Sequence, residues 1–260
     1  MLFATRQILQ TNSNDALNMA TLKLTNPHSV LAALKHRPQD VMEVHASTTK
    51  SSEAWKEAAE TARSMRISVQ EPISQGNRRR RQRDESGRIG TTYGVVREKS
   101  SVTLDDLFSD ASPRGLWLAF DQLQDPHNVG AVFRTAAFFG VKGVIMTQDR
   151  SAPLTGTVYD TAAGGVETVP IVMQTNLSRA LEVAKKKDLW VLGTSEHAEM
   201  KLAEVDRDRR WLLVIGNEEK GLRRLTQENC DQVCQIPPLG EVTSLNVSVA
   251  AGIMMATLTG

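Results

Sequence analysis

The sequence predicts an α/β protein of two domains, the larger built on a parallel sheet with helices on both faces. Strand-like apolar runs alternate with helix-like segments from residue 115 onward, which is typical of a parallel sheet. A shorter α–β–α–β pattern precedes them, and a polar segment ending in Pro113 and Gly115 separates the two parts. The 260 residues, 40% hydrophobic and 23% charged, suit a globular protein with a sizeable core.

The N-terminal domain is expected over residues 23–100. Pro27 and Ser29 precede apolar positions at helical spacing, which predicts a short helix, and a strand over 41–45 follows. The Ala-rich SSEAWKEAAETARSMRI predicts a second helix that leads into the strand-like ISVQEPI. The segment TTYGVVRE is expected to close the domain as a strand, and residues 101–114 are interpreted as a linker.

Residues 1–22 are interpreted as an N-terminal extension. They lack the compact apolar core of a secretory signal, so we expect a frayed end on a cytoplasmic protein. Because they are also poor in acidic residues, an organelle transit peptide stays the alternative. The longest apolar stretch falls short of the roughly 20 residues that a membrane span needs, so no membrane partner is expected.

An arginine-rich loop is expected within the N-terminal domain, in the segment SQGNRRRRQRDESGRIG. Its Gly, Ser and dense charge disfavour a packed element. The formal net charge is only +1, so any nucleic-acid binding depends on local patches such as this one. We interpret the loop as RNA-binding, with a solvated charge run as the alternative; the candidate phosphate contacts are Arg78, Arg79, Arg80, Arg81 and Arg83.

The larger domain is assigned to residues 115–260. Its expected strands are LWLAF, GVIMT, LWVLGT and WLLVIGN, and its expected helices are VGAVFRTAAFFG, LSRALEVAKKKD and GLRRLTQENC. Cys230 and Cys234 are the only cysteines and no His cluster has metal-ligand spacing, so neither a disulfide framework nor a bound metal is expected. We interpret both thiols as small buried side chains.

Polar residues and glycines follow three of the apolar runs, in DQLQDPHNVGAVFRTA, VIGNEEKGLRRL and IPPLGEVTSLNVSVAAG. In an open α/β sheet, ligands bind beyond the carboxyl ends of the strands, where helix starts offer backbone N–H groups. The G-x-G-x-x-G and Walker patterns are both absent. Spacing alone therefore indicates a nucleotide-binding α/β enzyme of unspecified reaction.

These three motifs closely resemble those of the SpoU branch of the SPOUT superfamily, from about Leu116 to the C-terminus. The resemblance implies a trefoil knot, S-adenosylmethionine as cofactor, and methylation of RNA ribose 2′-hydroxyls. The N-terminal region resembles, less specifically, the ribosomal-protein-like RNA-binding domain of bacterial 23S rRNA guanosine methyltransferases. It implies a guanosine in 23S rRNA as substrate. The alternatives are a tRNA guanosine, or a ribosome-assembly factor that binds RNA without catalysis.

By this resemblance the catalytic residues are Asn128, Arg134, Glu218, Ser244 and Asn246. The resemblance assigns cofactor contacts to Gly193, Thr194, Gly216, Ile236 and Leu245. A guanidinium is effectively always protonated, so we expect Arg134 to hold phosphate and stabilise negative charge on the 2′-oxygen. The group that takes the proton stays unassigned.

Each of these side chains also has an ordinary structural interpretation. Asn128 could cap a helix beginning near Val129, and Arg134 could form a surface ion pair. Glu218 could be a favourable charge at the N-terminus of the helix KGLRRL. Ser244 and Asn246 could cap the last helix, and Ile236 and Leu245 could be core residues. Two positions depart from the family pattern: Glu219 replaces a common glycine, and Pro238 replaces a common methionine and lacks an N–H.

The C-terminal stretch LNVSVAAGIMMATL is apolar on nearly every side if it is helical. One face of such a helix can pack on the sheet, but the other then needs a partner. Ala250, Ala251 and Gly252 are small enough for close backbone approach. We therefore expect a two-fold homodimer, with a helix buried inside one subunit as the alternative.

Overall fold

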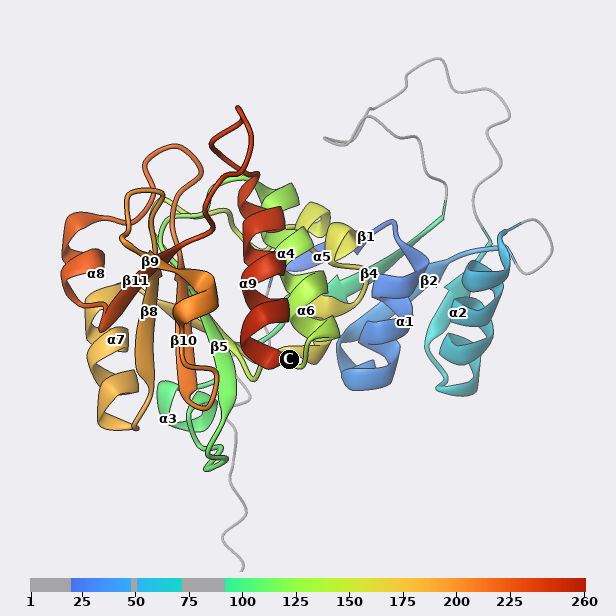
Figure 1. Ribbon diagram of the computed structural model, residues 1–260. Helices are drawn as coiled ribbons and strands as arrows, with labels where there is room; N and C mark the ends of the chain where they lie inside the picture. The colour runs from blue at the N-terminus through green and yellow to red at the C-terminus, as the bar shows by residue number, and fades with distance from the viewer. Residues whose placement is uncertain (1–19, 48–50, 72–91) are drawn as a thin grey trace, which may run out of the picture.

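The computed structural model describes residues 20–47, 51–71 and 92–260, which form a four-stranded and a seven-stranded sheet (Figure 1). The five arginines predicted to bind RNA, and nearly all of the N-terminal extension, lie outside these residues. Within them, no helix has both the length and the apolar composition that a membrane crossing requires.

The smaller sheet has the strand order β1-β4-β2-β3. Its strands are β1 (Thr21–Leu24), β2 (Val41–His45), β3 (Ser68–Gln70) and β4 (Tyr93–Arg97), and its helices are α1 (Pro27–His36) and α2 (Glu53–Ser64). A 3₁₀ turn, η2 (Pro38–Asp40), connects α1 to β2. The predicted helices and strands are confirmed, but β1 was not predicted. It is only four residues long and becomes a strand by pairing antiparallel with β4.

The larger sheet has the order β7-β6-β5-β10-β8-β11-β9, and every neighbouring pair is parallel. The strands are β5 (Gly115–Phe120), β6 (Val144–Thr147), β7 (Ile171–Gln174), β8 (Trp190–Thr194), β9 (Met200–Lys201), β10 (Arg210–Ile215) and β11 (Gln232–Gln235). The four predicted strands are confirmed. Three strands were not predicted: β9 has only two residues, β11 (QVCQ) begins and ends with glutamine, and β7 (IVMQ) has three apolar residues before its glutamine.

Helices cover both faces of this sheet (Figure 1). One face carries α4 (Pro126–Phe138), α5 (Gly156–Ala162), α6 (Gly165–Thr168) and α9 (Val247–Thr259); the other carries α3 (Leu104–Leu107), α7 (Leu177–Lys186) and α8 (Arg224–Glu228). A 3₁₀ turn, η3 (Leu202–Glu204), follows β9. Alternate residues of β5 serve the two faces: Leu118 and Phe120 enter the core with α4, whereas Trp117 and Ala119 enter the core with α7.

A buried ion pair joins the small sheet to the helices of the large one. The guanidinium of Arg37, just after α1, donates from Nε and Nη2 to the carboxylate of Glu167 in α6, at 2.7 and 2.8 Å. The Glu167 side chain is fully buried and that of Arg37 is 7% exposed. Burial alone lowers the pKa of Arg37, but the hydrogen bond and charge of Glu167 outweigh it, so the net pKa is raised.

Further contacts surround this ion pair. Lys99 donates from Nζ to the carbonyl oxygens of Val166, Glu167 and Val169, at 2.8 to 2.9 Å, at the end of α6. The carboxylate of Asp160 in α5 accepts from the backbone N–H groups of Thr25 and Asn26, at the start of α1. Because these contacts span both ends of α1, the small sheet has one fixed position against α5 and α6.

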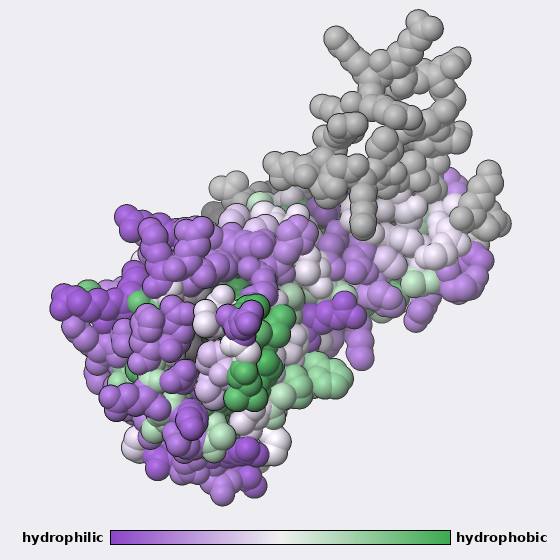
Figure 2. Space-filling model, turned by 45° about the horizontal axis from the view of Figure 1, so that its top comes forward, coloured by the Kyte–Doolittle hydropathy of each residue, from purple (hydrophilic) through white to green (hydrophobic). Residues whose placement is uncertain are grey.

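Helix α9 is only partly covered. Ala251, Met254 and Met255 are buried, whereas Val249 is 50% and Ile253 40% exposed. Figure 2 shows the resulting hydrophobic patch in the middle of the face over α9. The alternative of a helix buried inside one subunit is therefore wrong, and the homodimer stays a prediction.

The buried ion pair generates a stability prediction. Arg37→Met should lower the free energy of unfolding by about 3–5 kcal/mol, because it leaves the Glu167 carboxylate buried without a partner. The double variant Arg37→Met, Glu167→Met should recover most of that loss. Urea unfolding followed by circular dichroism measures both. Lys56→Ala, which breaks the exposed ion pair with Glu53, is the control and should cost less than about 1 kcal/mol. Equal losses of stability in Arg37→Met and Lys56→Ala would contradict the prediction.

Candidate active site

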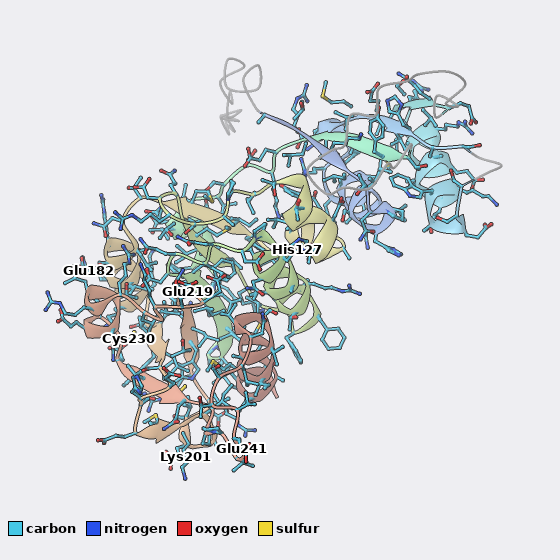
Figure 3. All side chains as sticks on the ribbon, turned by 90° about the horizontal axis from the view of Figure 1, so that it is seen from above. His127, Glu182, Lys201, Glu219, Cys230 and Glu241 are labelled. Atoms are coloured by element: carbon cyan, nitrogen blue, oxygen red, sulfur yellow. The ribbon has the colours of Figure 1, made fainter. Side chains whose placement is uncertain are left out.

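The three motifs converge at the carboxyl edge of the large sheet. Strands β5, β10, β8 and β11 are parallel neighbours, so the segments that follow them lie side by side. A cavity of about 510 Å³ opens there; its lining is Gln124, Asp125, Asn128, Asn217, Glu218, Glu219, Leu245, Asn246 and Val247. Figure 3 looks down onto this edge, with Glu219 above the sheet and His127 beside the first turn of α4.

Glu218 holds the loop after β5 against the loop after β10. Its carboxylate accepts from the backbone N–H of Asp125 at 3.1 Å and that of Gln124 at 3.4 Å. The side-chain amides of Asn128 and Asn217 also donate to it, each at 3.3 Å. Glu218 therefore lies at the N-terminus of α4. Its predicted alternative role at the helix KGLRRL is wrong, because α8 begins only at Arg224.

Asn128 and Asn246 connect the first motif to the third. The Nδ2 of Asn246 donates to the Oδ1 of Asn128 at 3.0 Å, while the Nδ2 of Asn128 donates to Glu218. Asn128 does not cap its helix, since α4 begins at Pro126 and Asp125 is its N-cap. Asn246 is the N-cap of α9, as its alternative interpretation predicted, and accepts from the N–H of Ser248 at 2.9 Å. Ser244 lies exposed two residues before that cap.

A tight turn forms the second motif. Asn217 and Gly221 exchange backbone hydrogen bonds of 3.0 and 2.9 Å, and a Cβ on Gly216 would meet the carbonyl carbon of Gly221 at 2.4 Å. Gly221 supplies the left-handed residue, with φ of 64°. Glu219, which replaces the family's common glycine, is not among the residues with positive φ, so it places no backbone strain on the turn.

The predicted cofactor contacts follow adjacent strands. Gly193 and Thr194 end β8, Gly216 follows β10 and Ile236 follows β11. A Cβ on Gly193 would meet the Sγ of Cys230 at 2.8 Å, so this glycine is fixed by packing. Ile236 packs partly buried against the core, but Leu245 is 50% exposed and is not a core residue. Exposed Leu239 and Val242, in the loop between β11 and α9, add apolar surface at the same edge.

Arg134 lies apart from the cluster that Asn128, Glu218 and Asn246 form. It is six residues after Asn128 on α4, about 9 Å along the helix and roughly 240° around it. Asn128 lines the cavity at the sheet edge, whereas Arg134 lines a different groove beside α1 and α6. Among the described residues it has no ion-pair partner, so the surface ion-pair interpretation is not supported within them.

Asp121 and Asn217 hold the loops of this site together and were not predicted from the sequence. Asp121, fully buried after β5, accepts from the Nε of Arg223 at 2.6 Å and from its backbone N–H at 2.9 Å. Asn217 donates to the carbonyl oxygen of Gln122 and to Glu218. Asp121 had a recognisable signal, since it is an ionisable residue directly after an apolar strand. Asn217 is part of the I-G-N-E motif, but its role depends on which loop faces it.

The cluster can orient a polar ligand but offers little for a metal. Across the described ranges, no three His, Cys, Asp or Glu side chains come together as a metal site. The carboxylate of Glu218 and the amide of Asn128 already have partners on several sides, which fixes their orientation. The apolar rim, with backbone groups at four strand ends, suits a flat ligand that has a polar edge.

The sequence and the fold both match characterised proteins. The sequence profile of the SpoU rRNA Methylase family matches residues 115–256. The 23S rRNA (guanosine-2′-O-)-methyltransferase RlmB of Pseudomonas aeruginosa is 39% identical over 239 residues, which cover 90% of this chain and 94% of that protein. RlmB of Bordetella pertussis is 36% identical over 241 residues, 91% of this chain and 96% of the relative.

Among solved structures, the SpoU methyltransferase AviRb from Streptomyces viridochromogenes, in complex with the cofactor AdoMet, superimposes with a TM-score of 0.75. The superposition covers 96% of this chain and 93% of AviRb, at 22% sequence identity. At that identity the likeness shows a shared fold. It extends over both sheets.

The contacts of Glu218 generate a prediction. Glu218→Gln should lower the free energy of unfolding by about 1 kcal/mol, because the new NH₂ group faces donors where the carboxylate accepted. Glu219→Gln is the matched control: within the described residues the Glu219 carboxylate accepts no hydrogen bond, and the change should stay within about 0.5 kcal/mol. Urea denaturation of both variants is the measurement, and identical stabilities would show that Glu218 does not hold the two loops together.

Proposed function

Because the chain belongs to the SpoU rRNA Methylase family, we propose that it transfers a methyl group to the ribose 2′-hydroxyl of a guanosine in 23S rRNA. The observation that carries this proposal is the hydrogen-bonded chain Glu218–Asn128–Asn246, which joins all three motifs at the carboxyl edge of the sheet. Both RlmB relatives match nearly their whole length, small domain included, which favours 23S rRNA over tRNA. A ribosomal substrate accords with the predicted cytoplasmic location.

The cofactor of this family, S-adenosylmethionine, supplies an electrophilic methyl group on a sulfonium sulfur. The residues at the sheet edge fit such a group. Leu245, Leu239 and Val242 expose apolar surface suited to a planar adenine, and the strand-end backbone at Gly193 and Gly216 offers polar groups for its edge. Pro238 has no N–H, so that position cannot donate a backbone hydrogen bond.

The polar chain works by positioning. Methyl transfer requires the attacking oxygen in line with the methyl carbon, so orientation supplies much of the rate. Asn128 has its amide oxygen and nitrogen engaged by Asn246 and Glu218, and Glu218 is held by two backbone N–H groups. These side chains therefore present a fixed surface to the ribose. The group that accepts the hydroxyl proton stays unassigned.

Arg134 supplies the electrostatic part, holding a phosphate of the RNA and stabilising charge on the 2′-oxygen. Arg134 lines a different groove from Asn128, so it lies apart from the cluster of its own subunit. We place it in the site of a second subunit, in a two-fold homodimer that covers the exposed Val249 and Ile253 of α9. The trefoil knot also stays a prediction; the insertion of β10 between β5 and β8 accords with it.

Single variants test the role of Arg134. Arg134→Ala and Arg134→Lys should each lose at least about 99% of the methyl transfer to unmodified 23S rRNA, because a lysine cannot reproduce a fork of donors. S-adenosylmethionine affinity, measured by calorimetry, should stay within about twofold. The measurement is tritium transfer from labelled S-adenosylmethionine, and near-normal turnover by the lysine variant would overturn the proposed role.

Mixing inactive variants tests the shared site. Arg134→Ala and Asn128→Ala, unfolded together and refolded at equal amounts, should regain about a quarter of the wild-type activity, since half of the dimers then carry one intact site of two. Each variant refolded alone is the control. A mixture as inactive as its components would place Arg134 in the site of its own subunit.

A further inference from the structure

A second groove, of about 680 Å³, lies between the small sheet and the helices of the large one. It is lined by α1, the second half of α4 and the α5–α6 turn, which lie side by side in Figure 1. Its volume falls in the roughly 300–1,000 Å³ range of ligand sites. The proposed chemistry uses only Arg134 of its lining, so the rest of the groove has no assigned role.

Two successive glycines set the distance between the walls of this groove. A Cβ on Gly164, whose φ is +99°, would meet the Cβ of Ala32 in α1 at 2.9 Å. A Cβ on Gly165 would meet the backbone oxygen of Phe133 in α4 at 2.6 Å. Both helices therefore approach the α5–α6 turn as closely as backbone allows.

The wall formed by α1 is also held in place by charge. Arg37 directly follows the groove residues Lys35 and His36, and its buried pair with Glu167 ties the end of α1 to α6. The groove is thus preformed. A ligand that binds between the two walls does not have to bring them together, which lowers the entropic cost of binding.

The lining has the charge that a nucleic acid requires. Lys35, His36 and Arg134 line the groove, and no acidic side chain does. Lys35 and Arg134 are basic side chains, and the His36 imidazole lies next to Lys35 in the sequence. The whole chain has a net charge of only +1, so this local excess is a feature of the groove.

The groove also carries an aromatic side chain in water. Phe138, at the end of α4, is 82% exposed, and its ring meets that of Phe139 edge-on at 5.0 Å. An exposed phenyl ring next to cations is the arrangement on which unpaired bases stack. One turn earlier on the same helix, Arg134 lines the same groove.

We propose that this groove binds an unpaired stretch of the substrate RNA next to the methylated nucleotide, with a base on Phe138 and phosphates on Lys35 and His36. The proposal rests on the proposed function, because it takes the RNA from Arg134 outward along α4. It also gives the small sheet and its helices a role in RNA binding, since α1 supplies one wall of the groove.

A second copy of this chain is the competing occupant, because α4, which carries Phe138, packs against α9 with its exposed Val249 and Ile253. In a two-fold contact centred on the groove, however, the Lys35, His36 and Arg134 of one subunit would meet their own copies. Like charges brought together in this way are unfavourable, whereas the phosphates of RNA would neutralise them. Charge thus favours RNA in the groove and a partner subunit on α9.

The test uses a double variant of the groove, Lys35→Ala with Phe138→Ala, which we call the groove variant. The control is the double variant Lys186→Ala with Leu225→Ala, which removes an exposed lysine and an exposed apolar side chain on the opposite face of the sheet. Full-length proteins are assayed on unmodified 23S rRNA for methyl transfer and for RNA affinity by filter binding. The groove variant should raise the KM for RNA by about 10-fold or more with kcat within about twofold, since a stacked base and a phosphate contact are lost. The slope of log RNA affinity against log salt concentration should also become shallower by about one for the groove variant, because one phosphate contact is lost. The control should match wild type in both measurements.

Three results would overturn the proposal. If wild type is active and the groove variant has the same KM and RNA affinity as wild type, the groove proposal is wrong and the proposed function is unaffected. A groove variant that sediments as a monomer at concentrations where wild type is a dimer would assign the groove to the subunit interface. A wild-type protein that transfers no methyl group to 23S rRNA would refute the proposed function itself, and the groove proposal would fall with it.

Discussion

The geometry of one helix, α4, constrains most of what this protein can do. Its thirteen residues begin at the carboxyl edge of the sheet and end beside the small sheet, so one rigid rod connects the polar cluster to the interdomain groove. Side chains along it turn by about 100° per residue, so Asn128 and Arg134 must face different sites. The buried face, with Val132, Phe133 and Ala136, fixes that orientation against the core.

At the N-terminus of α4, a carboxylate occupies the backbone N–H groups that a glycine-rich loop would offer to a phosphate. The carboxylate of Glu218, from the loop after β10, accepts the N–H groups that precede the helix. An anionic ligand would compete with that carboxylate for the same donors. The site is thereby suited to a cationic sulfonium cofactor and an uncharged ribose hydroxyl, and our proposals assign the RNA phosphates to Arg134 and the groove.

The surface beside the other end of α4 depends on the contacts that hold the small sheet in place. Glu167 and Lys99 bring charged groups into a region that excludes water, which is favourable only when both are satisfied. Lys99 donates to three carbonyls at the end of α6, and burial lowers its pKa to about 8. These contacts give a composite surface of α1, α4 and the Gly164–Gly165 turn that neither sheet would present alone.

The sequence by itself determined the fold class, four of the seven strands of the large sheet and the three motifs of the site. Those signals are local: apolar runs, capping residues and short motifs are readable without knowing what faces them. It did not identify β1, β7, β9 or β11, whose residues become strands only through neighbours. Tertiary structure alone decided that Asp125 rather than Asn128 caps α4, that Gly221 rather than Glu219 takes the left-handed turn, and that Arg134 faces away from the cluster. The Asn128 amide shows why local patterns could not decide the site: it is oriented by Glu218 and Asn246, which are 90 and 118 residues away along the chain.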